Sequence, residues 1–366
     1  MFSSSIMRKL DISRTTINRD MMYQNSLVLG LFLIYATLAT IFFVVNGLID
    51  HANYAIYKLP YYFIFGIILL VKLVAHMLSN KMVHGQYMSP NGAYKELRTH
   101  WLNLNVVLAV FVPLVMISLL MSIFGSVKTL FPLVNPFFLD FDLMELDRTL
   151  HFGFHPWEIT HALFGSVFMT SVLDFLYQLW FILLMAFTVW MVTNYKLGAV
   201  RTKFLVSYVL TWSLLGTLLA AILSAAGPCF YGDFVQGENV YGPLMERLNE
   251  ISNILKADGG DVGLYAMLNQ GLLWSFYTDD YIGLGSGITA MPSMHVSFAM
   301  LLFLSVRELN RKAGYVALLY LVLIQIGSVH LGWHYALDGY VSIILTWVIW
   351  RFSGWLTARV TKASHS

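Results

Sequence analysis

The chain has 366 residues, of which 58% are hydrophobic and only 11% are charged. Soluble domains carry about 25% charged residues, so this composition excludes an ordinary water-soluble protein. The formal net charge of +2 gives no reason to expect a nucleic-acid partner, and the single cysteine, Cys229, excludes an internal disulfide framework and a cysteine-rich metal site.

The apolar residues fall in long runs, which is typical of helices that cross a bilayer and need about 20 mostly apolar residues. By this measure the sequence predicts eight spans: Ser26–Leu48, Leu59–Leu78, Trp101–Phe124, Ser171–Thr193, Phe204–Ala225, Pro292–Val306, Ala313–His330 and Leu337–Trp355. The sixth is short, and its helix is expected to begin within the preceding loop. The predicted fold is therefore all-α, a polytopic transmembrane helix bundle.

The predicted organisation follows from these spans: residues 1–24 form a cytoplasmic tail, 25–100 two accessory spans, and 101–366 a six-span core with outer loops at 125–170 and 226–290. In the first outer loop, mixed apolar and acidic spacing predicts a helix on the membrane interface. Pro156 in the same loop suits the first turn of another short helix. The second loop ends in the glycine-rich YIGLGSGITA, which we interpret as a flexible turn.

The distribution of basic residues predicts the orientation, because Lys and Arg concentrate on the cytoplasmic side of membrane proteins. With the N-terminus placed inside, the inner segments hold 16 of the 22 basic residues and the outer segments hold 5, while Lys72 lies in the second span. We therefore expect both termini in the cytoplasm and the two long loops on the extracytoplasmic side.

Two short motifs carry the candidate chemistry, and the first is MPSMHVS at the outer start of the sixth span. Ser293 in this motif can cap the helix. A helix start also exposes free backbone N–H groups, which together with the helix dipole make a site for a phosphate. His295 at this position can donate a proton to a bound oxyanion or take one from it.

The second motif, HLGWHYALD, lies at the outer turn between the seventh and eighth spans. His334 and Asp338 are four residues apart and share one face of a helix. An Asp that accepts a hydrogen bond from one ring nitrogen fixes the tautomer and leaves the other nitrogen nucleophilic. Gly332 permits the turn, and both motifs arrive at the same face of the membrane.

These motifs resemble those of the type 2 phosphatidic acid phosphatase superfamily, PSGH at one span start and SR-x5-H-x3-D at the next outer turn. PSMH (Pro292–His295) is similar to the first, and Gly332, His334 and Asp338 match the second. The resemblance implies that His334 attacks phosphorus to form a phosphohistidine while Asp338 orients its ring. His295 would protonate the leaving oxygen and then activate water or an alcohol. The resemblance also implies a lipid substrate in the bilayer, without a metal or cofactor.

Departures from the family pattern point to one branch of it. The family's Ser-Arg pair falls on Gly327 and Ser328, its motif glycine is Met294, and no Lys-x6-Arg-Pro motif precedes the sixth span. Here the sequence is similar to the inositol phosphorylceramide synthase and sphingomyelin synthase branch, whose members transfer phosphorylated headgroups between lipids. We therefore expect a lipid phosphotransferase, with a phosphatidate or polyprenyl diphosphate phosphatase as the alternative.

The sequence does not determine which residue replaces the missing basic residues that bind phosphate. The long outer loops offer four cations, Lys128, Arg148, Arg247 and Lys256, and any one of them is more often a solvated charge. We take Arg148 as the candidate phosphate-binding cation. Ser293 is the second candidate, although a helix cap is an equally good interpretation of it.

Two interpretations from other classes stay open. His330, His334 and Asp338 could be ligands in a metal-dependent membrane enzyme, but only if a continuous helix runs through Gly332. A transporter or a scaffold is the other, although the sequence lacks the paired repeats that are typical of transporters. The donor lipid, the acceptor and the oligomeric state leave no signature in the sequence.

Overall fold

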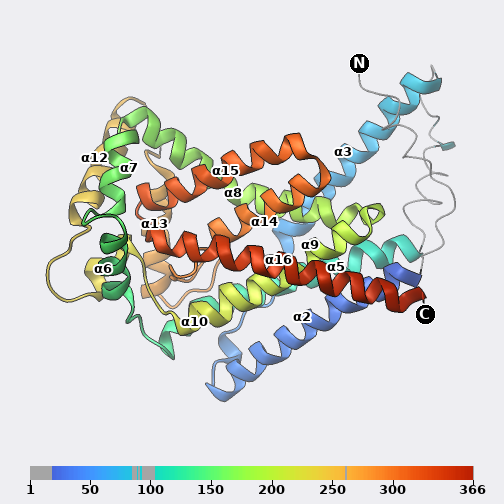
Figure 1. Ribbon diagram of the computed structural model, residues 1–366, viewed down its shortest axis with the longest axis horizontal. Helices are drawn as coiled ribbons and strands as arrows, with labels where there is room; N and C mark the ends of the chain where they lie inside the picture. The colour runs from blue at the N-terminus through green and yellow to red at the C-terminus, as the bar shows by residue number, and fades with distance from the viewer. Residues whose placement is uncertain (1–18, 85–88, 90, 93–103, 260–261, 366) are drawn as a thin grey trace.

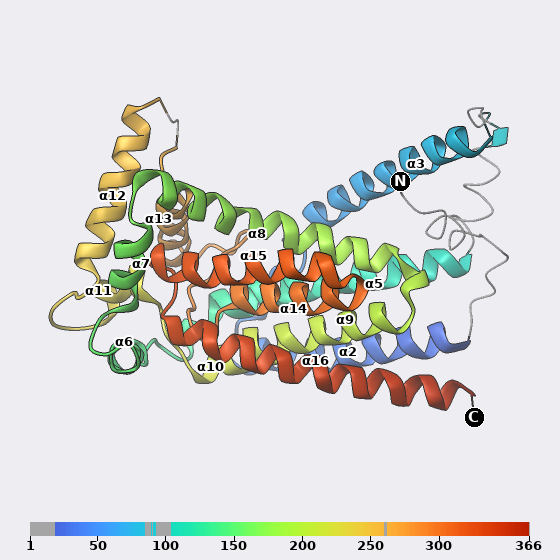
Figure 2. The same cartoon turned by 45° about the horizontal axis from the view of Figure 1, so that its top comes forward.

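The computed structural model describes residues 19–84, 89, 91–92, 104–259 and 262–365. All regular structure within these residues is helical, which confirms the predicted all-α bundle. Figures 1 and 2 show long helices running side by side, with shorter helices gathered at one end. In the described part of the chain, seven helices are long and apolar enough to cross a membrane. The chain is therefore an integral, multi-pass membrane protein.

The long helices are α2 (Arg19–Val45), α3 (Lys58–His84), α5 (Leu104–Leu130), α8 (Val167–Thr193), α9 (Ala199–Leu210), α15 (Arg311–His330) and α16 (Ala336–His365). A π-helical segment, η6 (Thr211–Leu219), and the short α10 (Ala220–Ile222) continue α9. Helix α2 begins before the predicted Ser26, so residues 19–24 of the predicted tail are helical. The rest of that tail and residues 101–103 of the third predicted span lie outside the described residues.

The predicted sixth span corresponds to α14 (Met294–Leu309), which has only 16 residues and packs mainly against α15 and α16. The expectation that this helix begins within the preceding loop is wrong. Residues 279–293 contain only turns and extended chain. Pro292 disfavours helical geometry at the residue before it, and Ser293 caps the first turn, so the helix starts at Met294.

The shorter helices are α6 (Asp140–Leu150), α7 (Pro156–Phe164), α11 (Tyr231–Phe234), α12 (Gly242–Ala257) and α13 (Tyr265–Thr278). Single 3-10 turns lie at Ile49–His51, Phe131–Leu133, Tyr195–Leu197 and Pro228–Phe230. The two helices predicted in the first outer loop are therefore present as α6 and α7, and Pro156 occupies the first position of α7. These helices surround the end of the bundle at which α15 stops and α16 starts (Figure 2).

Candidate active site

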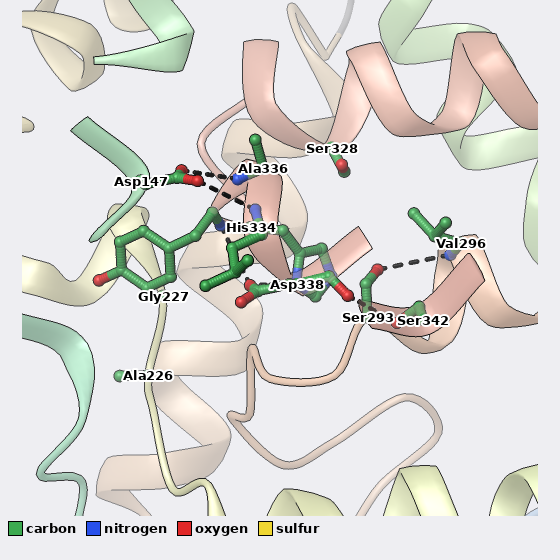
Figure 3. A network of polar contacts seen from close by, with 12 residues as sticks. Asp147, Ala226, Gly227, Ser293, Val296, Ser328, His334, Ala336, Asp338 and Ser342 are labelled. Carbon is green, nitrogen blue, oxygen red and sulfur yellow. Dashed lines mark hydrogen bonds and ion pairs between the residues drawn. The ribbon is translucent and has the colours of Figure 1, made fainter. Parts of the chain in front are cut away.

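The two predicted motifs meet in the structure. In Figure 3, His334 and Asp338 lie beside Ser293, at the start of α14. The Ser293 backbone N–H donates to the Asp338 carbonyl at 3.5 Å, and Ser342 Oγ donates to the same carbonyl at 2.7 Å. The start of α14 and the first turns of α16 are therefore in direct contact.

A tight turn after α15 positions His334. Gly332 has a φ of +75°, a left-handed conformation that favours glycine, and a Cβ there would lie 3.3 Å from Met245 Sδ. Beyond the glycine, the backbone N–H groups of Trp333 and His334 both donate to the Ser328 carbonyl, at 2.9 and 3.1 Å. The predicted turn at Gly332 is confirmed, and it fixes the backbone of His334 against the end of α15.

Two buried aspartates of α6 hold this turn and the start of α16. Asp147 accepts the backbone N–H groups of Ala336 and Leu337 at 2.7 and 3.0 Å. These first-turn groups have no partner within the helix, so the carboxylate supplies one (Figure 3). Asp140 accepts the hydroxyl of Tyr335 at 2.9 Å, together with two backbone N–H groups before α11. Burial raises the pKa of Asp140, and it raises the pKa of Asp147 to about 6.

His334 and Asp338 form the predicted pair. His334 Nδ1 lies 3.2 Å from Asp338 Oδ2, which also accepts the Tyr335 backbone N–H at 3.0 Å. Asp338 is fully buried, and its Oδ1 has no hydrogen-bond partner among the described residues. The pairing assigns the Nδ1 proton to the bond with Asp338. The lone pair of Nε2 is then available to an electrophile in the cavity that His334 lines.

His295 lies on the second residue of α14, facing His334. The centroids of the two imidazole rings are 6.0 Å apart. The His295 ring lies against Tyr177 and Trp180 of α8, with centroid distances of 4.4 and 4.1 Å. Trp180 Nε1 also donates to the His295 carbonyl at 3.0 Å. Two aromatic side chains therefore fix His295 in position, and no local pattern in the sequence indicates this stacking.

A cavity of about 410 Å³ connects the two histidines. Its lining comes from α5, α8, η6, α13 and residues 284–289, and most of it is apolar or aromatic. Lys128, in the last turn of α5, is the one Lys or Arg among the described residues that line it. Asp174 holds α13 over the cavity, because its carboxylate accepts the Tyr265 and Ala266 N–H groups at 2.7 and 2.8 Å. The cavity can thus enclose a charged group within a mostly apolar lining, which suits the headgroup of a lipid.

The two predicted phosphate-binding residues lie outside this lining. Ser293 is fully buried, and its hydroxyl accepts the Val296 N–H at 3.4 Å as a helix cap. Arg148 is half exposed, donates to the Gly153 carbonyl at 3.0 Å and lies 4.0 Å from Glu145. The short loop after α6 satisfies the Arg148 guanidinium, so the structure does not bring that cation to the histidines.

Arg247 also lies outside the cavity lining, and it donates a hydrogen bond to His161, which stacks on His330. The rings of His161 and His330 stack at 3.9 Å between centroids. His161 Nδ1 accepts from Arg247 Nε at 3.1 Å, and its Nε2 donates to the His330 carbonyl at 2.9 Å. Burial lowers the pKa of His161. His330 is the last residue of α15 and the chain turns before α16, so the continuous helix that a metal site on His330, His334 and Asp338 requires is not formed.

Comparison with protein families supplies independent information on the same region. A family model described as the PAP2 superfamily matches residues 141–352. The matched range runs from α6 into α16 and includes both histidines and Asp338. Comparisons with curated proteins and with solved structures found no match.

Proposed function

Because this chain belongs to the PAP2 superfamily, we propose that it is a membrane lipid phosphotransferase that works through a phosphohistidine on His334. Membership supports lipid phosphatase or phosphotransferase chemistry in general. The observation that carries the finer proposal is the 3.2 Å contact between His334 Nδ1 and Asp338, in a cavity shared with His295. An oriented imidazole with a free Nε2 is the arrangement that nucleophilic attack on phosphorus requires.

In the proposed first half-reaction, His334 Nε2 attacks the phosphorus of a lipid phosphodiester. The N–P bond forms as the P–O bond to the leaving lipid alcohol breaks, and His295 gives that oxygen its proton. Asp338 stabilises the positive charge that develops on the His334 ring. In the second half-reaction, an acceptor hydroxyl loses its proton to His295 and attacks phosphorus, so the N–P bond breaks and both histidines return to their starting forms.

We favour transfer over hydrolysis because the site has few positive charges. A phosphate monoester carries up to two negative charges and a phosphodiester one. The position of the family's missing arginine is Ser328, whose hydroxyl donates to the Gln325 carbonyl at 2.8 Å. The H-Y-x-x-D form of His334–Asp338 is also similar to the branch that transfers headgroups between lipids. A phosphatase acting on phosphatidate or a polyprenyl diphosphate is the second candidate, since water could replace the alcohol acceptor.

We further propose that the site faces the extracytoplasmic side. The positive-inside distribution of Lys and Arg supports this orientation. It puts both termini in the cytoplasm and the short helices α6, α7, α12 and α13 outside. The turn that carries His334 then lies near the outer interface, where lipid headgroups are found.

The test is an assay of the purified protein with a labelled phosphodiester lipid, run with and without a lipid alcohol. We expect the labelled headgroup to appear on the alcohol, orthovanadate to inhibit as a mimic of pentacoordinate phosphorus, and EDTA to leave the rate unchanged. Phosphatidate hydrolysis without any transfer would instead identify a phosphatase. Loss of activity in EDTA, restored by zinc, would contradict the proposed mechanism.

A further inference from the structure

Lys128 occupies an unusual position for a charged side chain. It lies in the last turn of α5 and lines the cavity together with His295 and His334. No acceptor or carboxylate among the described residues pairs with its ammonium. A charged group without a partner in a mostly apolar cavity is unfavourable, and ionisable groups in transmembrane helices mark binding sites or ion paths.

Residues 285–287 fix the Lys128 stem from one side. Gly285 N–H donates to the Tyr57 hydroxyl at 3.2 Å, and the Ser286 hydroxyl lies 2.8 Å from Thr129 Oγ1. Ser286 is 2% exposed, so this segment is a packed turn and not the flexible one expected from its glycines. Gly287 has a φ of +91°, and a Cβ there would meet Lys128 Cγ and its carbonyl carbon at 2.9 Å. The chain thus requires glycine where it contacts this lysine.

The other outer cations are placed differently. Arg148 is bonded to its own loop, and Arg247 is bonded to His161 and to the Gly165 carbonyl at 2.7 Å. Lys256 is exposed at the end of α12. Of the four candidates considered from the sequence, Lys128 is the one whose charge is left unpaired in the cavity.

We propose that Lys128 supplies the positive charge that binds the substrate's phosphate in the cavity of His334 and His295. The inference deepens the proposed function and rests on it. The family match begins at residue 141, after α5, and therefore assigns Lys128 no role. One ammonium balances the single charge of a phosphodiester, and the apolar and aromatic side chains of the lining offer a surface to the lipid part.

The experiment compares the full-length wild-type protein with Lys128→Met, Lys128→Gln and Lys128→Arg. The donor KM, kcat and the inhibition constant of orthovanadate are measured for each. Removal of a charge-assisted hydrogen bond to an anion lowers the affinity by about 10- to 100-fold. For Lys128→Met and Lys128→Gln we therefore expect the donor KM and the inhibition constant of vanadate to rise by this factor. For Lys128→Arg both constants should stay within a few-fold of wild type. Lys256→Met, the loss of an exposed outer lysine, is the matched control and should change neither.

The outcomes separate the two proposals. Wild-type KM and vanadate inhibition in folded Lys128→Met or Lys128→Gln, with thermal melting as the check on folding, would overturn the assignment of Lys128. Equal losses in the Met and Arg variants would also overturn it, because a role in packing does not follow charge. If the wild-type protein neither transfers a headgroup nor responds to vanadate, the proposed function itself fails, and the assignment of Lys128 falls with it.

Discussion

The carboxylate of Asp147 accepts the backbone N–H of Ala336 at 2.7 Å, although the two residues are 189 positions apart in the sequence. Its second oxygen accepts the N–H of Leu337 at 3.0 Å. Asp338 is the next residue along α16, so the bond between α6 and α16 fixes the helix turn that carries the partner of His334. Asp147 lies outside the lining of the cavity, so it holds the His334–Asp338 pair through the backbone of α16.

Asp147→Ala should lower both stability and turnover. The change leaves two first-turn N–H groups of α16 without a partner, and each such loss is worth about 1–3 kcal/mol. We expect a lower melting temperature in detergent and a fall in kcat that exceeds any rise in KM. Glu145→Ala removes an exposed carboxylate from the same helix and should leave both unchanged. Wild-type melting and kcat in Asp147→Ala would show that this contact does not position the pair.

The raised pKa of Asp147 predicts a specific pH dependence of stability. Burial raises this pKa from 3.8 to about 6, so between these values the folded chain binds a proton that the unfolded chain does not. Protonation of Asp147 therefore adds most to the free energy of unfolding below pH 4, and this added stability is lost as the pH rises through 6. The change corresponds to about 3 kcal/mol.

Asp147→Asn should remove this pH dependence. The free energy of unfolding of the variant should therefore be lower than that of the parent protein by a larger amount at pH 4.5 than at pH 7. His151 Nδ1 lies 3.9 Å from the carboxylate, so the comparison belongs in a His151→Gln background. Chemical unfolding at several pH values is the measurement. A constant difference between the two proteins across that range would contradict the assigned shift.

Asp338→Asn should slow turnover by several orders of magnitude while leaving donor binding nearly intact. An amide cannot stabilise the charge that develops on His334, and the equivalent change in a Ser-His-Asp triad costs about 10⁴ in kcat. Single-turnover kinetics separate the chemical step from binding. A loss of less than about tenfold would mean that Asp338 does not control the ring of His334.

Reporter fusions can test the proposed orientation of the chain across the membrane. Fusions after Phe230 and after Asp280 should be active only with a reporter that requires the extracytoplasmic side, and a fusion after Glu308 only with a cytoplasmic one. The position after Asp280 is the informative one, because His295 follows within the same segment. A cytoplasmic signal there would reverse the proposed sidedness of the site.

The long helices could be predicted from the sequence because a bilayer imposes one simple requirement, a run of about 20 apolar residues. Helix α14 tested the limit of that rule. At 16 residues it is shorter than a typical span, so its apolar run predicts its presence but not its start, which depends on the cap at Ser293 and on Pro292. The turn at Gly332 was also predictable, because a single glycine between two spans is a local signal.

The surroundings of His334 and Asp338 could not be predicted, because they depend on contacts between residues that are distant in the sequence. Asp140, Asp147 and Asp174 all bind backbone N–H groups that lie between 86 and 190 positions away. Nothing in the residues near each aspartate indicates its partner. From the sequence, Arg148 was the preferred phosphate-binding cation, and only the fold shows that this arginine is bonded to its own loop while Lys128 lines the cavity.

Rapid quenching can detect the proposed covalent phosphorylation of His334. The purified protein is mixed with a phosphodiester lipid labelled at phosphorus, stopped within milliseconds, and digested for mass spectrometry. We predict acid-labile, base-stable label on His334, absent from His334→Ala and still formed in His295→Ala when the donor has a good leaving group. Full turnover by His334→Ala, or label on another residue, would show that His334 is not the nucleophile.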